Sequence, residues 1–412
     1  MSVTSPHASP FAATAPGARQ AVYAQLAKDG TVHQILLPGD QPAWLVTGYD
    51  EVRQVLGDPR FVKTGSPMRD AIQNLPEDVE RAISSDMLHL DPPDHTRLRR
   101  LVSAAFTRRR VEALTPRITS LADELLDAMA ASVESPVAAS IETRDRVDLI
   151  DAYAFPLPMT VICELLGVPS DDAAEFRGWS ATIVTGALIG PERWISAAIA
   201  LVGYIRSLLD AKRRTPADDL LSALVATHDG EDRLSEDELT SMVFLLLIAG
   251  HETTVNLIGN GAHTLLAHPD QLALLRAEPA RLPAFLEEIL RYEGPVQVAT
   301  PRFTAEAVVL GGVTIPAGET VVPALMPANR DGAHFADATA FDPTRHQNPH
   351  MAFGHGIHHC LGAPLARLEG RIALDRLFTR FPVVRLAVPA DELTWRPSFL
   401  MHGLSSLPVT LR

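Results

Sequence analysis

The stretch that decides the fold runs from residue 353 to residue 362 and reads Phe-Gly-His-Gly-Ile-His-His-Cys-Leu-Gly. Its glycines Gly354, Gly356 and Gly362 let the backbone bend tightly and approach a flat group closely. The helical pattern APLARLEGRIALDRLF follows at once, so Cys360 lies beside the start of a helix. The positive partial charge at a helix N-terminus favours an anionic sulfur. We therefore predict that Cys360 is a metal-ligating thiolate.

Two other interpretations of Cys360 stand beside this one. A lone cysteine is often only a small buried residue in a turn. Zinc is also conceivable, because three histidines crowd around the cysteine: His355, His358 and His359. Neighbouring residues seldom converge on one tetrahedral ion, however, and the only other cysteine of the chain is Cys163. We therefore favour a thiolate of Cys360 that ligates a metal without these histidines.

A second motif lies about one hundred residues upstream, where the apolar run SMVFLLLIAG continues into His251-Glu252-Thr253-Thr254. An apolar helix that carries an acid and a hydroxyl in its middle needs a reason, because buried polar groups cost free energy. The hydroxyl of Thr253 could simply bond the carbonyl one turn earlier, as helical threonines often do. The role of His251 is open, since it could equally be a hydrogen-bonded core histidine.

The ten-residue pattern around Cys360 resembles the haem-binding signature of cytochromes P450, and every usually fixed position of that signature is filled. The resemblance implies haem b (iron protoporphyrin IX) with Cys360 as its axial ligand. It also implies that the haem is held by a set of residues on the loop and on the distal helix: Phe353, Gly354, Gly362, Ala249 and Gly250. By the same resemblance, Thr253 hydrogen-bonds the oxygen that is being activated, and Glu252 relays protons.

Further elements of the family pattern extend the resemblance to nearly the whole chain. Glu288 and Arg291 share one helix face, and they match the family's Glu-x-x-Arg element. In the family this element pairs with an arginine just upstream of the cysteine loop, and Arg345 in FDPTR matches that arginine. These three residues are expected to be structural. Four cationic or imidazole side chains match the residues that bind the haem propionates: His95, Arg99, Arg302 and His358.

The rest of the sequence agrees with one mainly α domain of the cytochrome P450 fold with a small β-rich lobe. We expect a flexible tail over residues 1–20 and a single domain over 21–412. Residues 43–47 predict a strand, and residues 302–325 a small antiparallel sheet. The pattern EVRQVLGDP, which follows Tyr49-Asp50, predicts a helix that Gly57 and Pro59 end. Asp94 is the expected N-cap of a basic helix.

The composition of the chain limits the classes of partner that it can bind. A net charge of -14 disfavours nucleic acid and anionic membranes, and the longest strongly apolar run, Met242 to Ala249, is too short to span a bilayer. With two cysteines and no secretory signal, the expected location is the reducing cytoplasm. The protein is expected to be a monomer. The P450 fold is expected to account for all of the chain, which leaves no residues for a fused electron-transfer module. Electrons should therefore come from separate proteins, a ferredoxin and an NAD(P)H-dependent ferredoxin reductase. A basic cluster is the expected docking site of the donor: Arg97, Arg100, Arg108, Arg109 and Arg110.

The family pattern implies monooxygenation: one atom of O2 enters a C–H bond or a double bond. A non-catalytic haem sensor is the alternative class, but it would not need Glu252 and Thr253. The substrate is expected to be a bulky apolar natural product, a macrolide or other polyketide, with a terpenoid or steroid as the alternative. Its expected contacts are all uncharged: Met87, Leu88, Leu245, Ile248, Val296, Val298, Phe399, Leu400 and Met401.

Overall fold

The computed structural model describes residues 10–37, 41–64, 75–134, 146–169, 172–185, 190–226 and 233–412. Its chain falls into two compact units, each assembled from separate segments. The first unit comprises Met1–Phe61, Thr115–Leu157 and Thr253–Arg412, and the second comprises Val62–Leu114 and Pro158–Glu252. The single domain that the sequence predicts over 21–412 stays a prediction.

Helices make up most of both units, as predicted. Those of the first unit are α1 (Ala18–Leu26), α2 (Tyr49–Gly57), α6 (Thr115–Glu134), α12 (Pro269–Ala277), α13 (Leu282–Glu293), α14 (Leu325–Ala328) and α15 (Ala363–Arg380). Those of the second are α3 (Glu77–Ser84), α4 (Asp94–Ala105), α5 (Arg108–Ala113), α8 (Ala173–Thr185), α9 (Pro191–Arg214) and α10 (Leu220–Val225). The boundary between the units falls within α7 (Pro156–Leu166) and α11 (Glu236–Ala267).

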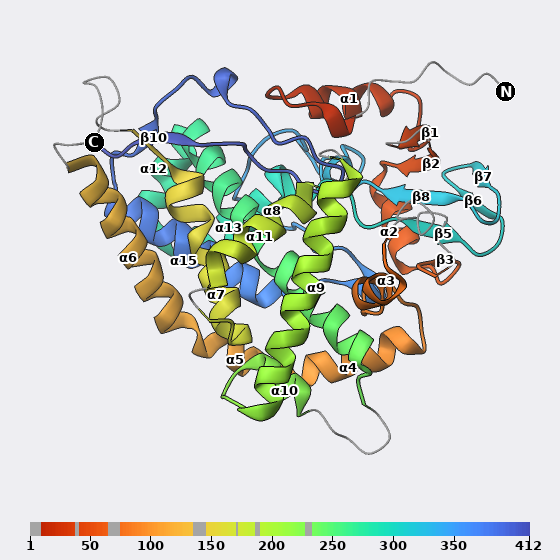
Figure 1. Ribbon diagram of the computed structural model, residues 1–412. Helices are drawn as coiled ribbons and strands as arrows, with labels where there is room; N and C mark the ends of the chain where they lie inside the picture. The colour runs from red at the N-terminus through yellow and green to blue at the C-terminus, as the bar shows by residue number, and fades with distance from the viewer. Residues whose placement is uncertain are drawn as a thin grey trace. The chain divides into compact units, whose positions relative to one another are not determined.

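The main sheet has five strands in the order β1-β2-β8-β5-β3. Its strands are β1 (Val32–Leu37), β2 (Gln41–Val46), β3 (Phe61–Val62), β5 (Arg302–Thr304) and β8 (Thr320–Pro323). Figure 1 shows β1, β2 and β8 stacked beside the hairpin of β6 (Val308–Leu310) and β7 (Val313–Ile315). A separate small sheet joins β4 (Arg146–Asp148), β10 (Pro408–Thr410) and β9 (Arg385–Leu386).

The predicted antiparallel sheet over 302–325 is only partly correct. β6 and β7 do pair antiparallel, and so do β5 and β8. However, β8 also pairs in parallel with β2, where Trp44 faces Val321, so two of these strands belong to a mixed sheet with the N-terminal strands. Parallel partners lie far apart in the sequence, and local patterns do not reveal them.

Alternation along the strands buries both faces of the main sheet. Val46 and Val321 belong to a cluster that includes the apolar face of α2. Their neighbours Leu45 and Val322 belong to a second cluster, which includes Tyr23 of α1. Successive side chains of a strand point to opposite faces, so one sheet supports two core layers.

Two predictions at the chain's first helices need correction. The flexible tail expected over 1–20 is wrong from residue 10 onward, because η1 (Pro10–Ala12) and the start of α1 lie there, and Phe11 and Arg19 are buried. Residues 1–9 lie outside the described part of the chain. In the basic helix α4, Asp94 is the first helical residue and Pro93 the N-cap. An acid in the first turn still favours the helix start.

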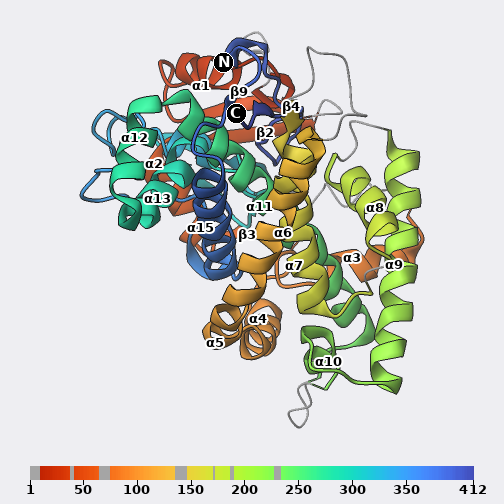
Figure 2. The ribbon, with the colours of Figure 1, turned by 90° about the vertical axis from the view of Figure 1, so that its left-hand side faces the viewer.

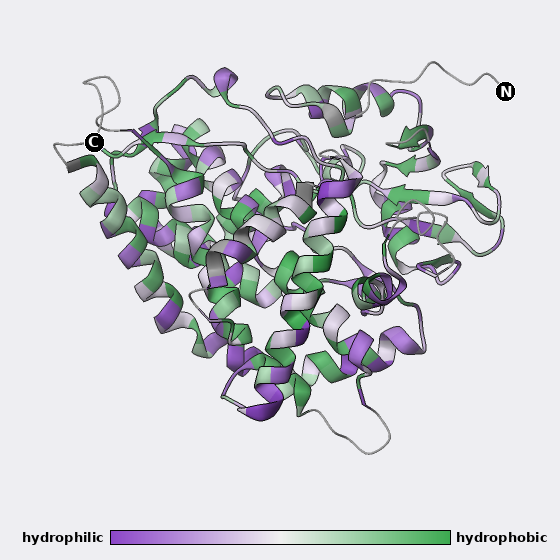
Figure 3. Ribbon diagram, in the orientation of Figure 1, coloured by the Kyte–Doolittle hydropathy of each residue, from purple (hydrophilic) through white to green (hydrophobic). Residues whose placement is uncertain are grey.

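The two longest helices of the described chain are α9, with 24 residues, and α11, with 32. By length and composition, α9 and α11 could each cross a membrane, but two thirds of the most apolar window of α11 is buried (67%), as expected of a core helix. Figure 3 shows both hydrophilic and hydrophobic residues along α9, and seven of its residues are buried on one side, among them Leu201, Ile205 and Leu208. In the first unit, α6 and α15 lie side by side (Figure 2), and Arg376 of α15 bonds Asp123 of α6 at 2.6 Å.

Candidate functional site

The loop before α15 is built as the sequence motif predicts. Gly354 and Gly356 both have φ of 72°, in the left-handed region that favours glycine. At Gly356 a side chain is excluded by space as well, since a Cβ atom there would lie 2.4 Å from the carbonyl oxygen of Leu56 in α2. The amide of Cys360 donates to the carbonyl of Phe353 at 2.9 Å and closes the loop. α15 begins at Ala363, three residues after the cysteine.

The two cysteines have opposite surroundings. Cys163 is buried in α7, and burial raises the pKa of its thiol to about 11, so it stays protonated and inert. Cys360 is exposed on its loop. A metal ligand must be accessible to the group it binds, and only Cys360 meets this condition.

A salt-bridge cluster between α13 and α15 contacts the cysteine loop at Phe353. Arg367 of α15 lies over the ring of Phe353, with Cζ 4.4 Å from the centroid, and donates to Glu287 of α13 at 2.7 and 2.8 Å. His350 contacts the same carboxylate at 3.0 Å. Burial would raise the pKa of Glu287, but hydrogen bonds from Arg367 and His350 outweigh it and lower the pKa to about 2. The carboxylate therefore stays ionised and holds the Arg367 cation against the loop.

Sequence reasoning missed Glu287, His350 and Arg367. The available signal was the acid next to Glu288 and an arginine seven residues after Cys360. Neither indicates a partner by itself, because Glu287 and Arg367 are 80 residues apart.

In the structure Glu288, Arg291 and Arg345 lie in contact with one another. Arg291 donates to Glu288 at 2.6 and 2.8 Å, and Arg345 donates to the same carboxylate at 3.2 Å. Glu288 and Arg291 are essentially inaccessible (0% and 1% exposed), and Arg291 also donates to the carbonyls of Asn329, Ala338 and Ala340. Every donor of the buried guanidinium is thus engaged, which makes this trio a structural anchor.

The distal motif lies in the middle of α11, which is continuously α-helical from Glu236 to Ala267. A Cβ atom at Gly250 would lie 3.0 Å from the side chain of Ile162, so glycine permits close packing of α7. Although most of this helix is buried, one stripe is not: Leu245, Ile248 and Thr253 are partly exposed and Ala249 is exposed. These positions lie on one face of a helix. Glu252 is buried, at 2% exposed.

The four predicted propionate partners lie on three elements. His95 (2% exposed) and the partly exposed Arg99 stand on α4 of the second unit. Arg302 (3% exposed) stands on β5 of the first unit and donates to the carbonyl of Thr300 at 2.9 Å, and His358 lies partly exposed on the cysteine loop. Two guanidinium and two imidazole groups form a donor set that suits carboxylates. Their joint role remains a prediction.

The predicted substrate contacts form local groups within each unit. In the first unit Val296 pairs with Met401 in an antiparallel bridge, and the amide of Gln297 donates to the carbonyl of Leu400 at 2.9 Å. Val298 is buried, whereas Phe399 is partly exposed. This brings the 296–298 and 399–401 segments side by side.

In the second unit, the loop that carries the predicted contacts Met87 and Leu88 is tied to α11. Asp86 accepts from the Leu88 amide at 2.7 Å and from the Ser241 hydroxyl at 3.1 Å. Leu245 and Ile248 follow Ser241 on the same helix, at the partly exposed stripe. The loop and the stripe are therefore anchored to one another by Asp86.

These residues fit haem better than a protein-bound zinc ion. Among the described residues, no three His, Cys, Asp or Glu side chains are grouped as a metal site requires, so the histidines near Cys360 do not form one with it. The exposed sulfur offers one ligand. The accessible stripe of α11 is apolar apart from Thr253 and suits a flat ring and an apolar molecule. Haem, when bound, supplies the iron that activates oxygen.

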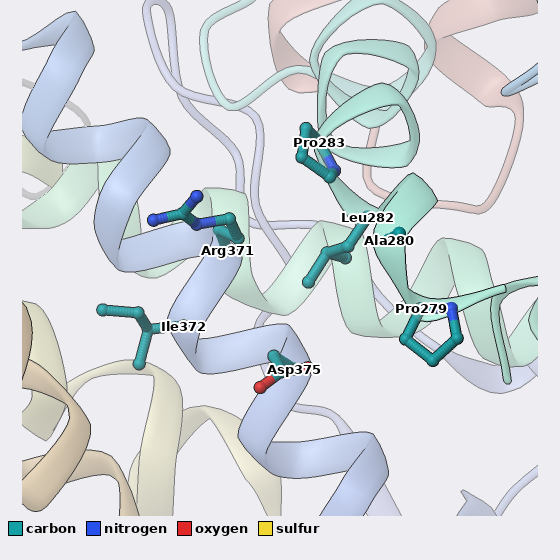
Figure 4. A pocket seen from close by; sticks show the side chains of 7 residues that line it. All are labelled: Pro279, Ala280, Leu282, Pro283, Arg371, Ile372 and Asp375. Carbon is teal, nitrogen blue, oxygen red and sulfur yellow. The ribbon is translucent and has the colours of Figure 1, made fainter.

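A shallow pocket of about 280 Å³ lies elsewhere in the first unit, between the η6 turn (Pro279–Arg281) and α15. Figure 4 shows Arg371, Ile372 and Asp375 of α15 on one side of it and residues 279–283 on the other. It contains none of the predicted site residues, and we assign it no role.

A mainly α fold, an exposed cysteine on a glycine-rich loop and a buried Glu-x-x-Arg pair are together typical of a haem-thiolate enzyme. Comparison with known proteins agrees, because residues 199–405 match the family model described as Cytochrome P450. The chain belongs to the cytochrome P450 family, and is a haem-thiolate monooxygenase with protoporphyrin IX iron as its cofactor.

Relatives match over nearly the full length. The chain is 48% identical to a vitamin D(3) 25-hydroxylase from Pseudonocardia autotrophica over 395 residues (94% of this chain and 93% of the relative). It is 46% identical to a 6-deoxyerythronolide B hydroxylase from Saccharopolyspora erythraea, over 94% of this chain and 95% of the relative. The solved structure of the tirandamycin C-bound P450 monooxygenase TamI is 45% identical, with a TM-score of 0.85 over 95% of this chain and 97% of that one.

Proposed function

We propose that this enzyme hydroxylates or epoxidises a bulky, mostly apolar natural product, a macrolide or other polyketide. The observation that carries the proposal is the uncharged character of the accessible stripe on α11 and of the paired segments 296–298 and 399–401. Such surfaces select a ligand by shape and by the apolar area removed from water, at about 25 cal/mol per Å². A small or anionic substrate would lack a charged partner among these residues.

The relatives support this substrate class. The hydroxylase from Saccharopolyspora erythraea acts on 6-deoxyerythronolide B, and TamI binds tirandamycin C. A terpenoid or steroid is the second candidate, which the 48% identity to a vitamin D(3) 25-hydroxylase favours. Both candidates are large and predominantly apolar, and both suit the uncharged surfaces.

The protein's residues divide the work as follows. Cys360 would hold the haem iron from the loop, and the pair of Glu287 and Arg367 holds the loop. His95, Arg99, Arg302 and His358 would bind the haem propionates. Thr253 would offer its hydroxyl as a hydrogen-bond donor on the distal side, and Glu252 would supply protons there. The apolar stripe orients the substrate and excludes water.

Electrons come from a separate ferredoxin and its NAD(P)H-dependent reductase. The donor docks at the basic residues of α4 and α5, of which Arg100, Arg109 and Arg110 are exposed. Arg97 is less available, because it is ion-paired with Glu238. The enzyme works in the cytoplasm as a monomer.

Ligand-induced spin-shift titration tests the substrate class directly. The purified holoenzyme is titrated with macrolides, linear polyketides, sterols, terpenoids and short fatty acids, and displacement of the water ligand is followed in the Soret region. We expect macrolides or other polyketides to bind most tightly. Tight binding of sterols or terpenoids alone selects the second candidate, and tight binding of short fatty acids alone overturns both.

A further inference from the structure

The distal helix carries a buried histidine that the assigned roles leave unexplained. His251 is 0% exposed, and both of its ring nitrogens have close contacts. Nδ1 lies 2.7 Å from the carbonyl oxygen of Leu247, and Nε2 lies 2.7 Å from Oγ of Ser180 in α8. The Phe176 ring, also on α8, packs edge-on at 5.8 Å.

These contacts define the protonation state of the ring. A carbonyl oxygen only accepts, so Nδ1 carries the hydrogen and donates it to Leu247. In the neutral ring Nε2 is then the acceptor, and the Ser180 hydroxyl donates to it. Nε2 is therefore the one ring atom at which His251 can take up or release a proton.

The same atom faces the acid of the distal motif. Oε2 of Glu252 lies 3.8 Å from Nε2 of His251. Consecutive helix residues point in directions about 100° apart and do not ordinarily face one another. Both side chains are thus turned toward each other, and Ser180, His251 and Glu252 are all nearly inaccessible (0%, 0% and 2% exposed).

We propose that Ser180 and His251 are positioning residues that orient Glu252 and resupply it with protons. The proposal rests on the proposed role of Glu252 in proton delivery. A hydronium ion gives a proton to Nε2 and leaves a water molecule, the ring becomes cationic, and the Ser180 hydroxyl turns to accept from Nε2. A small movement of the two side chains then brings Nε2 and Oε2 from 3.8 Å to hydrogen-bond distance. Nε2 gives its proton to Oε2, so the ring returns to its neutral form and Glu252 becomes the neutral acid. No electron moves, and only N–H and O–H bonds change.

Variants of Ser180 isolate this link from general effects on α8. Ser180→Ala removes the hydroxyl, and Ser180→Thr retains it. Thr182→Ala is the matched control, because Thr182 is a partly exposed residue of the same helix. Among the contacts described, its hydroxyl bonds only the carbonyl of Gly178, at 2.9 Å. His251→Asn, which can still donate to Leu247 but has no Nε2, tests the ring in case the Ser180 variant is unstable.

In the holoenzyme with its substrate and redox partners, Ser180→Ala and His251→Asn should lower product formed per NAD(P)H about fivefold or more, the factor that one ordinary hydrogen bond is worth. The lost electrons should appear as hydrogen peroxide, and the solvent deuterium isotope effect on turnover should rise. Spin-shift substrate affinity should stay within about twofold, and Ser180→Thr and Thr182→Ala should match the wild type. A merely structural role would change affinity and thermal stability but leave coupling and the isotope effect unchanged, and that result overturns the proposal.

A readout independent of turnover is the tautomer of His251. In ¹⁵N-histidine spectra of the reduced carbon monoxide complex, the signal absent from His251→Asn identifies this residue. We expect a ring protonated at Nδ1 whose Nε2 shift changes in Ser180→Ala. A ring protonated at Nε2 alone, or no change in Ser180→Ala, overturns the inference. If the wild type lacks the haem-thiolate spectrum, or if Thr253→Ala and Glu252→Gln remain fully coupled, the proposed roles of the distal motif fail instead.

Discussion

Cys360 lies exposed on a loop whose shape depends on two left-handed glycines, and Cys163 lies buried in α7. The sequence separates the two by motif, and the structure explains the separation physically. The hydrogen bonds from Arg367 to Glu287 are the main reason why the pKa of the Arg367 guanidinium is raised. The nearby sulfur of Cys360 also raises the pKa of Arg367, as a smaller contribution. A neighbouring cation favours the thiolate over the thiol.

Replacement of the two cysteines should therefore have opposite results. Cys360→His should abolish the red-shifted Soret band of the reduced carbon monoxide complex, because an imidazole lacks the anionic sulfur that mixes with the porphyrin orbitals. Cys163→Ser is the control and should keep the band. Difference spectra of the two purified variants decide the matter, and an unaltered band in Cys360→His would contradict the ligand assignment.

At the scale of elements, the sequence predicted what local patterns encode. The strand and helix over residues 43–57 and the distal helix are found where periodicity and turn residues indicated them. Contacts between distant segments were predicted only where a family motif pointed to them, as for Glu288, Arg291 and Arg345. The link of Ser180 to His251 spans 71 residues and has no motif. This hydrogen bond depends on how α8 packs against α11. A single serine in a helical sequence does not indicate that packing, so the contact could not be predicted.

The buried Glu288–Arg291 pair in α13 should matter far more to stability than a surface pair of similar spacing. Arg291→Ala leaves an inaccessible carboxylate without its main partner, at a cost of about 3–5 kcal/mol. The control is Arg108→Ala, which breaks the exposed Arg108–Glu112 pair and should cost little. Chemical denaturation of both variants measures the difference. Equal midpoints would show that the trio is not a structural anchor.

Glu369 makes α15 sensitive to pH. This carboxyl is 1% exposed, and burial raises its pKa from 4.5 to about 8. The folded state then holds a proton that the unfolded state releases above about pH 4.5, so stability from this group is fully present below that pH and is lost as the pH rises through about 8. Glu369→Gln keeps the shape but cannot ionise. The variant should gain thermal stability relative to the wild type between pH 6 and 9, and a constant difference in melting temperature over this range would contradict the raised pKa.

At the scale of the whole molecule, the charge is unevenly distributed. The chain carries a net charge of -14, yet α4 and α5 hold six arginines within a short stretch, including the run Arg108-Arg109-Arg110. Some of this charge is neutralised internally, as in the ion pairs of Arg97 with Glu238 and Arg108 with Glu112. Arg109 is one of the exposed arginines that give an acidic protein a local basic surface here. Such a surface would attract an acidic partner.

This asymmetry predicts how electron transfer should respond to salt. If an acidic ferredoxin docks at α4 and α5, its association is steered by charge, and the reduction rate should fall as salt shortens the Debye length below about 10 Å, its value at 0.1 M. Arg109→Glu should lower the bimolecular reduction rate at low salt about tenfold and weaken its dependence on salt. The reason is that an exposed charge changes the rate at which the two proteins associate and has little effect on the stability of the fold. Arg385→Glu is the control, since that arginine is exposed in the first unit on β9. Stopped-flow reduction by ferredoxin between 20 mM and 500 mM salt separates the alternatives. Rates that ignore ionic strength, or that respond equally to both charge reversals, would show that the donor docks elsewhere and that this basic surface is only solvated.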